Sequence, residues 1–405
     1  MLPFVQLMLA VIIIIVVAKA GGYLSYRLGQ PTVSGEVLAG LILGPSLLNM
    51  LNWPFFTDAH LADSISHLAE FGVLILMFLA GLELHLQDLV KSSKVAILAG
   101  TLGFIAPILM GYGVGKIFSF DLAQSLFIGL ALAPTSVSIS AQTLMELKAL
   151  RTPVGISLLG AAVVDDMLVV LGISLFAVFA GSSSGSVTVV LMILLRMIIF
   201  LVIAILLGIW VLPRLAHWVD RLPISQGLIA FALVVLLLYG WFAEVVGMMA
   251  VIIGSFLAGL FMGQSRVKEK IERGLLPIAY GFLVPIFFVN VGLSSNIRQI
   301  SGSGLWLLLW IVLVAIFSKV IGSSAGGLLG GLKPRQSLQL GASMISRGEV
   351  GLIAVSIGIT EGWISGDIAA DVVVMVVITT LITPPLLRLL FTREKAHQDQ
   401  LKTQA

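Results

Sequence analysis

The chain consists of long apolar runs separated by short polar loops, and thirteen apolar windows can be marked along its 405 residues. A transmembrane helix needs about 20 mostly apolar residues, and each window approaches or exceeds that length. The windows fall at 3–26, 33–50, 62–86, 92–117, 121–146, 151–180, 186–213, 224–240, 242–264, 271–293, 303–330, 335–360 and 368–391. This pattern predicts an all-α polytopic membrane protein with thirteen transmembrane helices. A short polar tail over 392–405 follows them.

Composition agrees with a membrane protein, because 59% of the residues are hydrophobic and only 11% are charged. A soluble domain carries about 25% charged residues. The chain contains no cysteine, which excludes disulfides and thiolate metal sites. We also expect no cofactor and no enzymatic activity.

The distribution of Lys and Arg predicts the orientation of the chain in the membrane. Seventeen of these residues lie in the loops and tail on one side, whereas the other side holds only Lys116 and Arg298. Cytoplasmic loops are enriched in positive charge. We therefore expect the C-terminus in the cytoplasm and the N-terminus outside.

Two segments of the chain recur in the same order. Residues 35–44 resemble residues 254–263, and residues 75–82 resemble residues 286–293 more weakly. The matched helices are seven apart, and an odd offset means that the two copies enter the membrane from opposite sides. Inverted repeats of this kind are typical of secondary transporters. The alternative is chance resemblance among helices rich in Gly, Ala and Leu.

The same offset pairs the fifth and twelfth predicted helices, and both are interrupted. In the fifth, Pro134 removes a backbone donor and precedes Thr135 and Ser136. In the twelfth, Gly348 lies between two opposite charges. Discontinuous helices at equivalent places in inverted repeats are the best sequence indication of a transport site. A simple kink relieved by the hydroxyls of Thr135 and Ser136 is the alternative for Pro134.

The charges beside the second interruption have a structural interpretation. Arg347 near the C-terminal end of one half-helix and Glu349 near the N-terminal end of the other would compensate the two helix dipoles. Direct contact of these residues with the ion is the alternative.

Two adjacent carboxylates, Asp165 and Asp166, lie within the apolar window 151–180. Ionisable groups at this depth are costly and indicate a functional site. Neighbouring side chains on a helix point about 100° apart, so the two carboxylates cannot face one small cavity equally. Lys319 is the only lysine deep in a later predicted helix, and its buried ammonium needs an anion. One aspartate is therefore expected to face the ion path and the other to pair with Lys319.

This triad predicts competition between cations and protons. A cation such as Na⁺ favours ionised carboxylates and expels protons, and protonation expels the cation. Competition at a site exposed alternately to each side of the membrane is antiport. A purely structural tie between an aspartate and Lys319 is the alternative, but it leaves the second aspartate unexplained. Glu70 and Asn290 are further polar candidates that could line the same cavity.

The motifs 163–166 (Val-Val-Asp-Asp) and 133–136 (Ala-Pro-Thr-Ser), together with Lys319 and Arg347-Gly-Glu349, resemble those of the monovalent cation:proton antiporters. The resemblance covers essentially the whole chain and is closest to the second branch, which includes NapA-type bacterial Na⁺/H⁺ antiporters. It implies an NhaA-like fold of thirteen helices with inverted repeats and two crossed discontinuous helices. It also implies that Asp166 is the principal carboxylate for ion and proton, that Asp165 pairs with Lys319, and that Na⁺ binds at Asp166, Asp165 and Thr135, with Ser136 nearby.

The resemblance also implies a domain division and an assembly. One transmembrane unit over 1–391 would contain a core domain, about 62–180 and 271–391, and a dimerisation domain, about 1–61 and 186–264. A homodimer through the first helices, elevator-type movement of the core and location in the bacterial inner membrane are expected. Two aspartates at the site imply electrogenic exchange.

The leading hypothesis is therefore exchange of cytoplasmic Na⁺ or Li⁺ for external H⁺. A K⁺/H⁺ antiporter of the same family is the nearest alternative, because the sequence does not determine cavity size or ligand number. The glutathione-gated potassium efflux proteins are disfavoured, because they carry Gln-Asp at 165–166 and a soluble nucleotide-binding domain. A cation channel would need a filter around a symmetric pore, and an intramembrane aspartyl protease would need aspartates on separate helices. Neither pattern occurs in this sequence.

Overall fold

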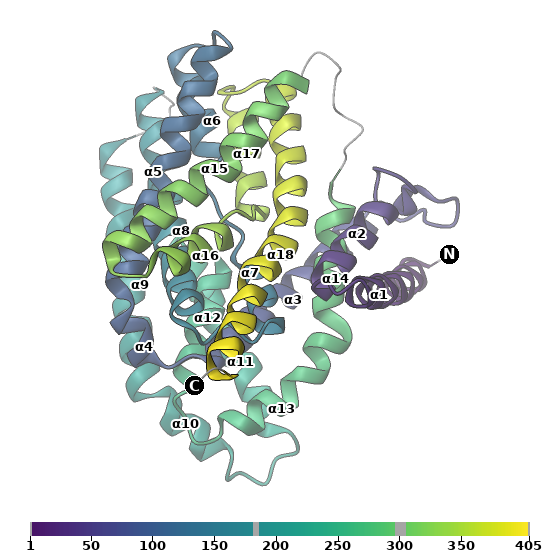
Figure 1. Cartoon of the computed structure of the whole chain (residues 1–405). Helices are drawn as coiled ribbons and strands as arrows, with labels where there is room; N and C mark the ends of the chain where they lie inside the picture. Colours follow the sequence, from purple (N-terminus) through teal and green to yellow (C-terminus); the bar gives the residue numbers. More distant parts are fainter. Residues whose placement is uncertain (1, 181–185, 296–304, 404–405) are drawn as a thin grey trace. The chain divides into compact units, whose positions relative to one another are not determined.

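The computed structural model describes residues 2–180, 186–295 and 305–403, and the side chains of these residues except Glu349 and 393–403. Within these ranges the regular structure is entirely helical (Figure 1). The all-α architecture predicted from the hydropathy pattern is therefore confirmed. Nine of the described helices are long and apolar enough to span a membrane, and four shorter apolar helices accompany them. The total of thirteen spans stays a prediction.

The chain divides into two compact units, which are described separately. The first consists of Met1–Lys19, Asn49–Lys91 and Val170–Asn290. It holds the first part of α1 (Pro3–Arg27), the last part of α8 (Pro153–Phe179) and most of α14 (Val284–Leu293). Its other elements are η1 (Met50–Asn52), α3 (Leu61–Glu83), α4 (Leu86–Lys91), α9 (Val187–Trp210), α10 (Leu212–Val219), α11 (Gly227–Val245), α12 (Val251–Met262), α13 (Lys268–Ile278) and the π-helix η2 (Ala279–Leu283).

The second unit consists of Ala20–Leu48, Ser92–Val169 and Val291–Ala405. Three helices contribute residues to both units, namely α1 (Pro3–Arg27), α8 (Pro153–Phe179) and α14 (Val284–Leu293). The remaining helices belong to the second unit: α2 (Thr32–Leu43), α5 (Ser93–Ile117), α6 (Leu122–Ala131), α7 (Val137–Glu146), α15 (Leu305–Gly330), α16 (Pro334–Ser343), α17 (Glu349–Thr360) and α18 (Gly366–Thr403).

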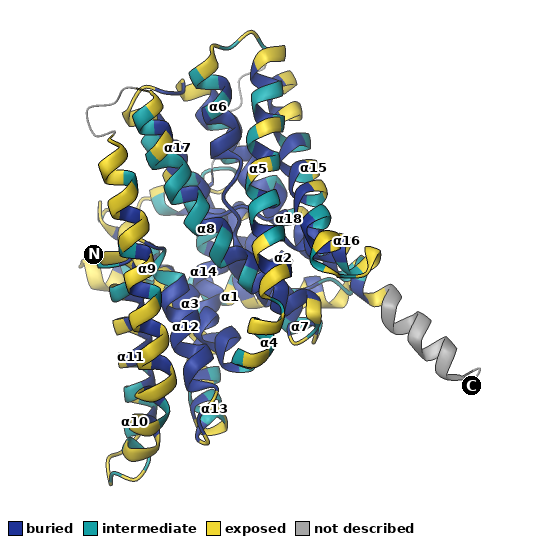
Figure 2. Ribbon diagram, turned by 90° about the vertical axis from the view of Figure 1, so that its left-hand side faces the viewer, coloured by how far each residue is buried: buried dark blue, intermediate teal, exposed yellow. Residues whose placement is uncertain are grey.

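Burial differs strongly between helices of the first unit. Every residue of α12 from Ile253 to Met262 is buried, whereas α9 exposes large apolar side chains such as Leu191, Leu195 and Val202 (Figure 2). Such surfaces are unfavourable in water and suit the hydrocarbon of a bilayer. The surface pattern therefore agrees with a membrane-embedded chain.

Glycines at the repeat positions allow close helix contacts, and the contacts themselves recur. In the second unit, a Cβ on Gly35 would clash with the carbonyl oxygen of Gly21. In the first unit, a Cβ on Gly254 would lie 2.8 Å from the Cα of Gly240. Gly35 and Gly254 are the first residues of the repeat segments 35–44 and 254–263, and Gly21 and Gly240 each lie 14 residues before them. Small residues let backbones approach in this way in membranes.

A second pair of glycine contacts follows the same rule. A Cβ on Gly81 of α3 would lie 3.1 Å from the carbonyl carbon of Gly259 of α12, within the first unit. A Cβ on Gly292 of α14 would lie 2.5 Å from the carbonyl carbon of Gly40 of α2, within the second unit. Gly81 matches Gly292 and Gly259 matches Gly40 in the predicted repeat. The repeat is thus present in the packing as well as in the sequence.

Both predicted interruptions are present. Helix α6 begins with Asp121 as its N-cap, whose carboxylate accepts a hydrogen bond from the Gln124 amide at 2.7 Å. It ends at Ala131, just before Pro134, and α7 begins at Val137. Helix α16 ends at Ser343 and α17 begins at Glu349, so five residues lie between them. Each predicted helix is therefore two half-helices joined by an extended segment.

Candidate ion site

The paired carboxylates lie on α8. Thr152 precedes this helix, and its hydroxyl accepts a hydrogen bond from the Gly155 amide at 3.3 Å, while Pro153 occupies the first position, where its missing amide costs nothing. The helix continues through the mostly apolar residues 154–164 to Asp165 and Asp166. Asp165 is completely buried, whereas Asp166 is 9% exposed. The two neighbours therefore have different surroundings, as helical geometry requires.

Asp165 has a partner on each oxygen. The Lys319 ammonium, on α15, lies 2.7 Å from Asp165 Oδ1, and both side chains are fully buried. The Thr135 hydroxyl, in the interruption between α6 and α7, donates to Oδ2 at 2.7 Å. Charge-assisted hydrogen bonds of this length are among the strongest in proteins. Asp165 is thus held in place by α15 and by the first broken helix.

The two interruptions cross and bind each other through their backbones. The Ser136 amide donates to the Ser346 carbonyl at 2.8 Å, and the Ser346 hydroxyl donates to the Ser136 carbonyl at 2.6 Å. The Ser140 hydroxyl, in the first turn of α7, donates to the Ser343 carbonyl at the end of α16 at 2.6 Å. These bonds satisfy backbone groups that the breaks would otherwise leave unpaired inside the membrane.

Arg347 is fully buried in the second interruption and binds backbone carbonyls. Its Nη1 donates to the Met344 carbonyl at the end of α16 at 3.2 Å, and its Nη2 donates to the Ala315 carbonyl at 2.9 Å. Ala315 lies one helical turn before Lys319. The Thr380 hydroxyl of α18 donates to the Arg347 carbonyl at 2.8 Å. Arg347 thus lies where it can compensate the C-terminal end of α16, and it also holds the turn of α15 that carries the lysine.

The four buried charges form one electrostatic group. Lys319 interacts with Asp165, with Asp166 and with Arg347. With both carboxylates ionised, two negative and two positive charges balance. Protonation of a carboxylate, or binding of a monovalent cation beside it, changes this balance by one unit. A proton and a cation can therefore replace each other at this group of charges.

The other predicted residues are placed as follows. The Ser136 hydroxyl is buried and has no hydrogen-bond partner among the described groups. Glu349 begins α17, but its side chain lies outside the described residues. Glu70 is exposed on α3 and Asn290 is half-buried on α14, and both belong to the first unit. The role of Glu70 and Asn290 in the cavity stays a prediction.

Sequence reasoning missed several residues that hold the site. Ser140, Ser346 and Thr380 supply hydroxyls to the crossing, but hydroxyl residues are frequent in apolar helices and carry little signal alone. Glu146 was also missed: its carboxylate accepts hydrogen bonds from the Thr32 amide at 2.8 Å and hydroxyl at 2.5 Å, at the start of α2. A carboxylate at a helix N-terminus is favourable, and only the fold brings these positions together.

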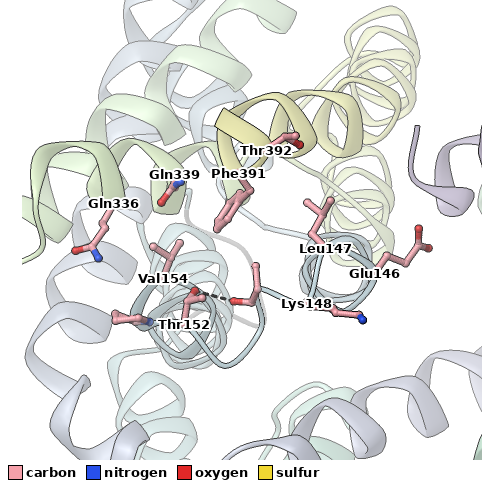
Figure 3. Close-up of a pocket in the computed structure, with 11 residues that line it drawn as sticks. Glu146, Leu147, Lys148, Thr152, Val154, Gln336, Gln339, Phe391 and Thr392 are labelled. Atoms are coloured by element: carbon pink, nitrogen blue, oxygen red, sulfur yellow. Dashed lines mark hydrogen bonds between the residues drawn. The ribbon is translucent and has the colours of Figure 1, made fainter. Parts of the chain in front are cut away.

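A separate cavity of about 570 Å³ opens between the end of α7, the starts of α8 and α16, and residues Phe391 and Thr392 of α18 (Figure 3). Its lining includes Thr152, Val154, Gln339 and Phe391. None of Asp165, Asp166, Thr135 and Lys319 lines it. This cavity is therefore not the site of the paired carboxylates.

Comparison with known proteins links the site to a transport family. The family model described as "Sodium/hydrogen exchanger, transmembrane" matches residues 11–392. The chain is 38% identical to the probable Na⁺/H⁺ antiporter GerT of Bacillus cereus, over 94% of this chain and 98% of that protein. It is 34% identical to the Na⁺/H⁺-K⁺ antiporter GerN of the same organism, over 95% of this chain and 96% of that protein.

The fold also matches a solved structure. The sodium proton antiporter MjNhaP1 from Methanocaldococcus jannaschii superimposes with a TM-score of 0.63 at 16% identity. The match covers 96% of this chain and 99% of that one. This likeness confirms the predicted fold class.

Proposed function

Because the chain belongs to the sodium/hydrogen exchanger family, we propose that it is a secondary active antiporter that exchanges cytoplasmic Na⁺ or Li⁺ for external H⁺. The observation that carries this proposal is the different setting of the two adjacent carboxylates: Asp165 is fully buried and bonded to Lys319 and Thr135, whereas Asp166 is 9% exposed. The names of the relatives GerT and GerN support Na⁺ and H⁺ as the exchanged ions.

Asp166 binds either a proton or the cation. Further oxygen ligands for the cation come from Asp165, Thr135 and Ser136. A hydroxyl that donates to Asp165 still has lone pairs to offer a cation. Protonation of Asp166 removes the negative charge that holds the cation, and binding of the cation displaces the proton. One ion therefore leaves when the other arrives.

The transport cycle follows the elevator scheme of the family. A core domain, about 62–180 and 271–391, carries the ion past a dimerisation domain, about 1–61 and 186–264, in a homodimer that joins through the first helices. The protein lies in the bacterial inner membrane with its N-terminus outside and its C-terminus in the cytoplasm, as the bias of Lys and Arg supports.

A second candidate is K⁺/H⁺ exchange. The Na⁺/H⁺-K⁺ antiporter GerN, 34% identical to this chain, carries K⁺ beside Na⁺ in its name. Na⁺ and K⁺ compete for similar oxygen ligands, so the residues of the site do not separate them.

Cation-induced collapse of a pH gradient in everted membrane vesicles tests both candidates. We expect Na⁺ and Li⁺ to dissipate the gradient, and Asp166→Asn to abolish the response at normal expression. A larger response to K⁺ than to Na⁺ would select the second candidate. Cation current without any proton gradient would instead indicate a channel.

The control is Glu269→Gln. Glu269 is a highly exposed carboxylate that pairs with Arg273 on α13, and its neutralisation should leave exchange at the native rate. Full Na⁺-dependent exchange in Asp166→Asn would overturn the assignment of the site.

A further inference from the structure

The hydrogen bonds between Glu146 and Thr32 join the far end of the first broken helix to the start of α2, within the second unit. Glu146 Oε2 accepts from the Thr32 amide at 2.8 Å, and Glu146 Oε1 accepts from the Thr32 hydroxyl at 2.5 Å. The side-chain amide of Gln142, one turn earlier on α7, donates to the same Oε1 at 3.1 Å. Both carboxylate oxygens are therefore held by the start of α2.

Glu146 is unfavourable in its own helix. It is the last residue of α7, and a negative charge near the C-terminal end of a helix opposes the helix dipole. Local helix energetics thus do not account for a glutamate at this position. A residue that breaks a local rule while it binds another element indicates a purpose that lies in the tertiary structure.

Helix α2 needs this partner. Its N-cap position is occupied by Pro31, which supplies no side-chain hydrogen bond to the first amides of the helix. The first amides of any helix lack a partner within it. The Glu146 carboxylate binds the Thr32 amide and brings a negative charge to the positive end of α2. Glu146 thus acts as the cap that Pro31 cannot provide.

The start of α7 lies at the candidate ion site. Thr135 donates to Asp165 Oδ2 at 2.7 Å. The amide of Ser136, the N-cap of α7, donates to the Ser346 carbonyl at 2.8 Å. Helix α7 has ten residues, which gives a length of about 15 Å. A single short helix moves as a unit, so a displacement of the end at Glu146 is transmitted to the interruption at the other end.

The surroundings of the far end leave room for such a displacement. Glu146, Leu147, Lys148 and Ala149 line the cavity of about 570 Å³ (Figure 3). Protein interiors are otherwise close-packed and hold an element in place by contact. Because the cavity replaces packed side chains on this side of α7, the position of its end depends more strongly on the bonds to Thr32.

We propose that Glu146 is a positioning residue for exchange. It fixes the far end of α7 on α2 and thereby holds Thr135 and Ser136 where they can serve the cation beside Asp165. Glu146 acts through α7 and not by contact with the ion. This inference rests on the proposed antiport function, because the residues that Glu146 positions are those proposed to bind the cation.

The kinetics of Na⁺-driven exchange in everted vesicles test this role at normal expression. Glu146→Gln replaces one acceptor oxygen by a donor, and Thr32→Val removes the hydroxyl donor. We expect each variant to raise the Na⁺ concentration for half-maximal exchange about threefold or more. The maximal rate should change less, because Asp166 is untouched. Thr32→Ser keeps both donors and should retain the native half-maximal concentration.

Glu361→Gln is the matched control. Glu361 is an exposed residue at the C-cap of α17, so it also places a carboxylate at the C-terminal end of a half-helix. This variant should keep the native half-maximal Na⁺ concentration. If Glu146→Gln and Thr32→Val lower the melting temperature but leave that concentration unchanged, the tie only stabilises the fold and the proposal is overturned.

Amide hydrogen exchange of the detergent-solubilised full chain tests the tie without transport. We expect the segment 132–146 to exchange faster in Glu146→Gln and Thr32→Val than in the native protein, and at the native rate in Thr32→Ser and Glu361→Gln. Native protection of this segment in all four variants would refute the proposal. If the native protein exchanges no cation for protons, the proposed function fails, whereas this comparison still decides whether Glu146 holds the interruption.

Discussion

Asp165 and Lys319 are both fully buried, so neither charge is hydrated and each depends on the other. The adjacent Asp166 points in another direction because successive helical side chains are about 100° apart. Two carboxylates that are identical in sequence thus acquire different chemistry from one helix. The pair Asp165–Lys319 ties α8 to α15, and our proposal assigns the exchange of ions to Asp166.

Removal of the lysine tests this dependence. We expect Lys319→Met to lower the free energy of unfolding by about 3 kcal/mol or more, because it leaves Asp165 charged and unpaired. The double variant Asp165→Asn/Lys319→Met should regain much of the loss, since it removes both charges. Thermal melting in detergent measures both effects. An unchanged melting temperature in Lys319→Met would contradict the structural role of the pair.

The hydroxyl of Thr135 gives a finer test at the same place. Thr135→Val keeps the shape of the side chain but removes the donor to Asp165 Oδ2, and we expect a loss of about 1–2 kcal/mol. Thr360→Val is the control, because the exposed Thr360 hydroxyl donates to the Ser356 carbonyl of its own helix at 2.9 Å. Its melting temperature should stay close to that of the native protein. Equal losses in both variants would mean that the bond to Asp165 adds nothing specific.

Single residues differ in how well the sequence predicts them. Asp165, Asp166 and Lys319 are recognisable because charge is rare in apolar windows. Ser346 and Thr380 are not recognisable, because their importance comes from carbonyls that lie 210 and 33 residues away along the chain.

At the scale of elements, the crossing of the two broken helices is the feature that creates the site. Each break leaves unpaired backbone groups, and the crossing satisfies them with the other break. Pro134 and Gly348 mark the two breaks in the sequence because each residue disfavours a continuous helix. The contact between the breaks is tertiary, so no local pattern predicts it.

The crossing is tight, and one methyl group should disturb it. A Cβ on Gly348 would lie 2.8 Å from the Cβ of Ser136. We expect Gly348→Ala to push the breaks apart, lowering both the melting temperature and the rate of Na⁺-dependent exchange. Gly351→Ala is the control on the same helix, because its Cβ would meet Val376 at 3.7 Å, an ordinary contact. If both variants behave like the native protein, the crossing can accommodate an added methyl group and is less tight than the structure indicates.

The boundary between α11 and α12 shows where hydropathy reasoning loses resolution. The predicted windows divide at about residue 241, whereas α11 continues to Val245 and α12 begins at Val251. The connection contains Gly247 and Met248, and Met248 adopts a positive φ of 51°. Apolar composition continues through the turn, so the change of backbone conformation leaves no polar signal.

At the scale of the whole molecule, the internal repeat accounts for close helix contacts that recur in the two units. The equivalent glycine pairs Gly35/Gly21 and Gly254/Gly240 show the same close approach in the two units. The repeat could be predicted from residues shared at the same spacing in two segments. Glycine is retained in both because a larger residue cannot replace it where two backbones touch. The domain division and the dimer remain predictions, since they depend on surfaces that no motif describes.

Charge movement is the property of the whole molecule that follows from the site. If Asp166 alone exchanged its proton for Na⁺, each cycle would move one charge in each direction and would be electroneutral. If cation binding also opens the Asp165–Lys319 pair, the lysine releases a second proton and one net charge moves per cycle. We expect the second case, because a bound cation beside Asp165 replaces the ammonium as its counter-charge.

In proteoliposomes, a membrane potential set by K⁺ and valinomycin should then change the rate of Na⁺-driven proton movement. The control Glu269→Gln should behave as the native protein does. In Lys319→Gln, any exchange that remains should be insensitive to the potential. A native rate that is equally insensitive would mean that the buried pair stays closed throughout the cycle.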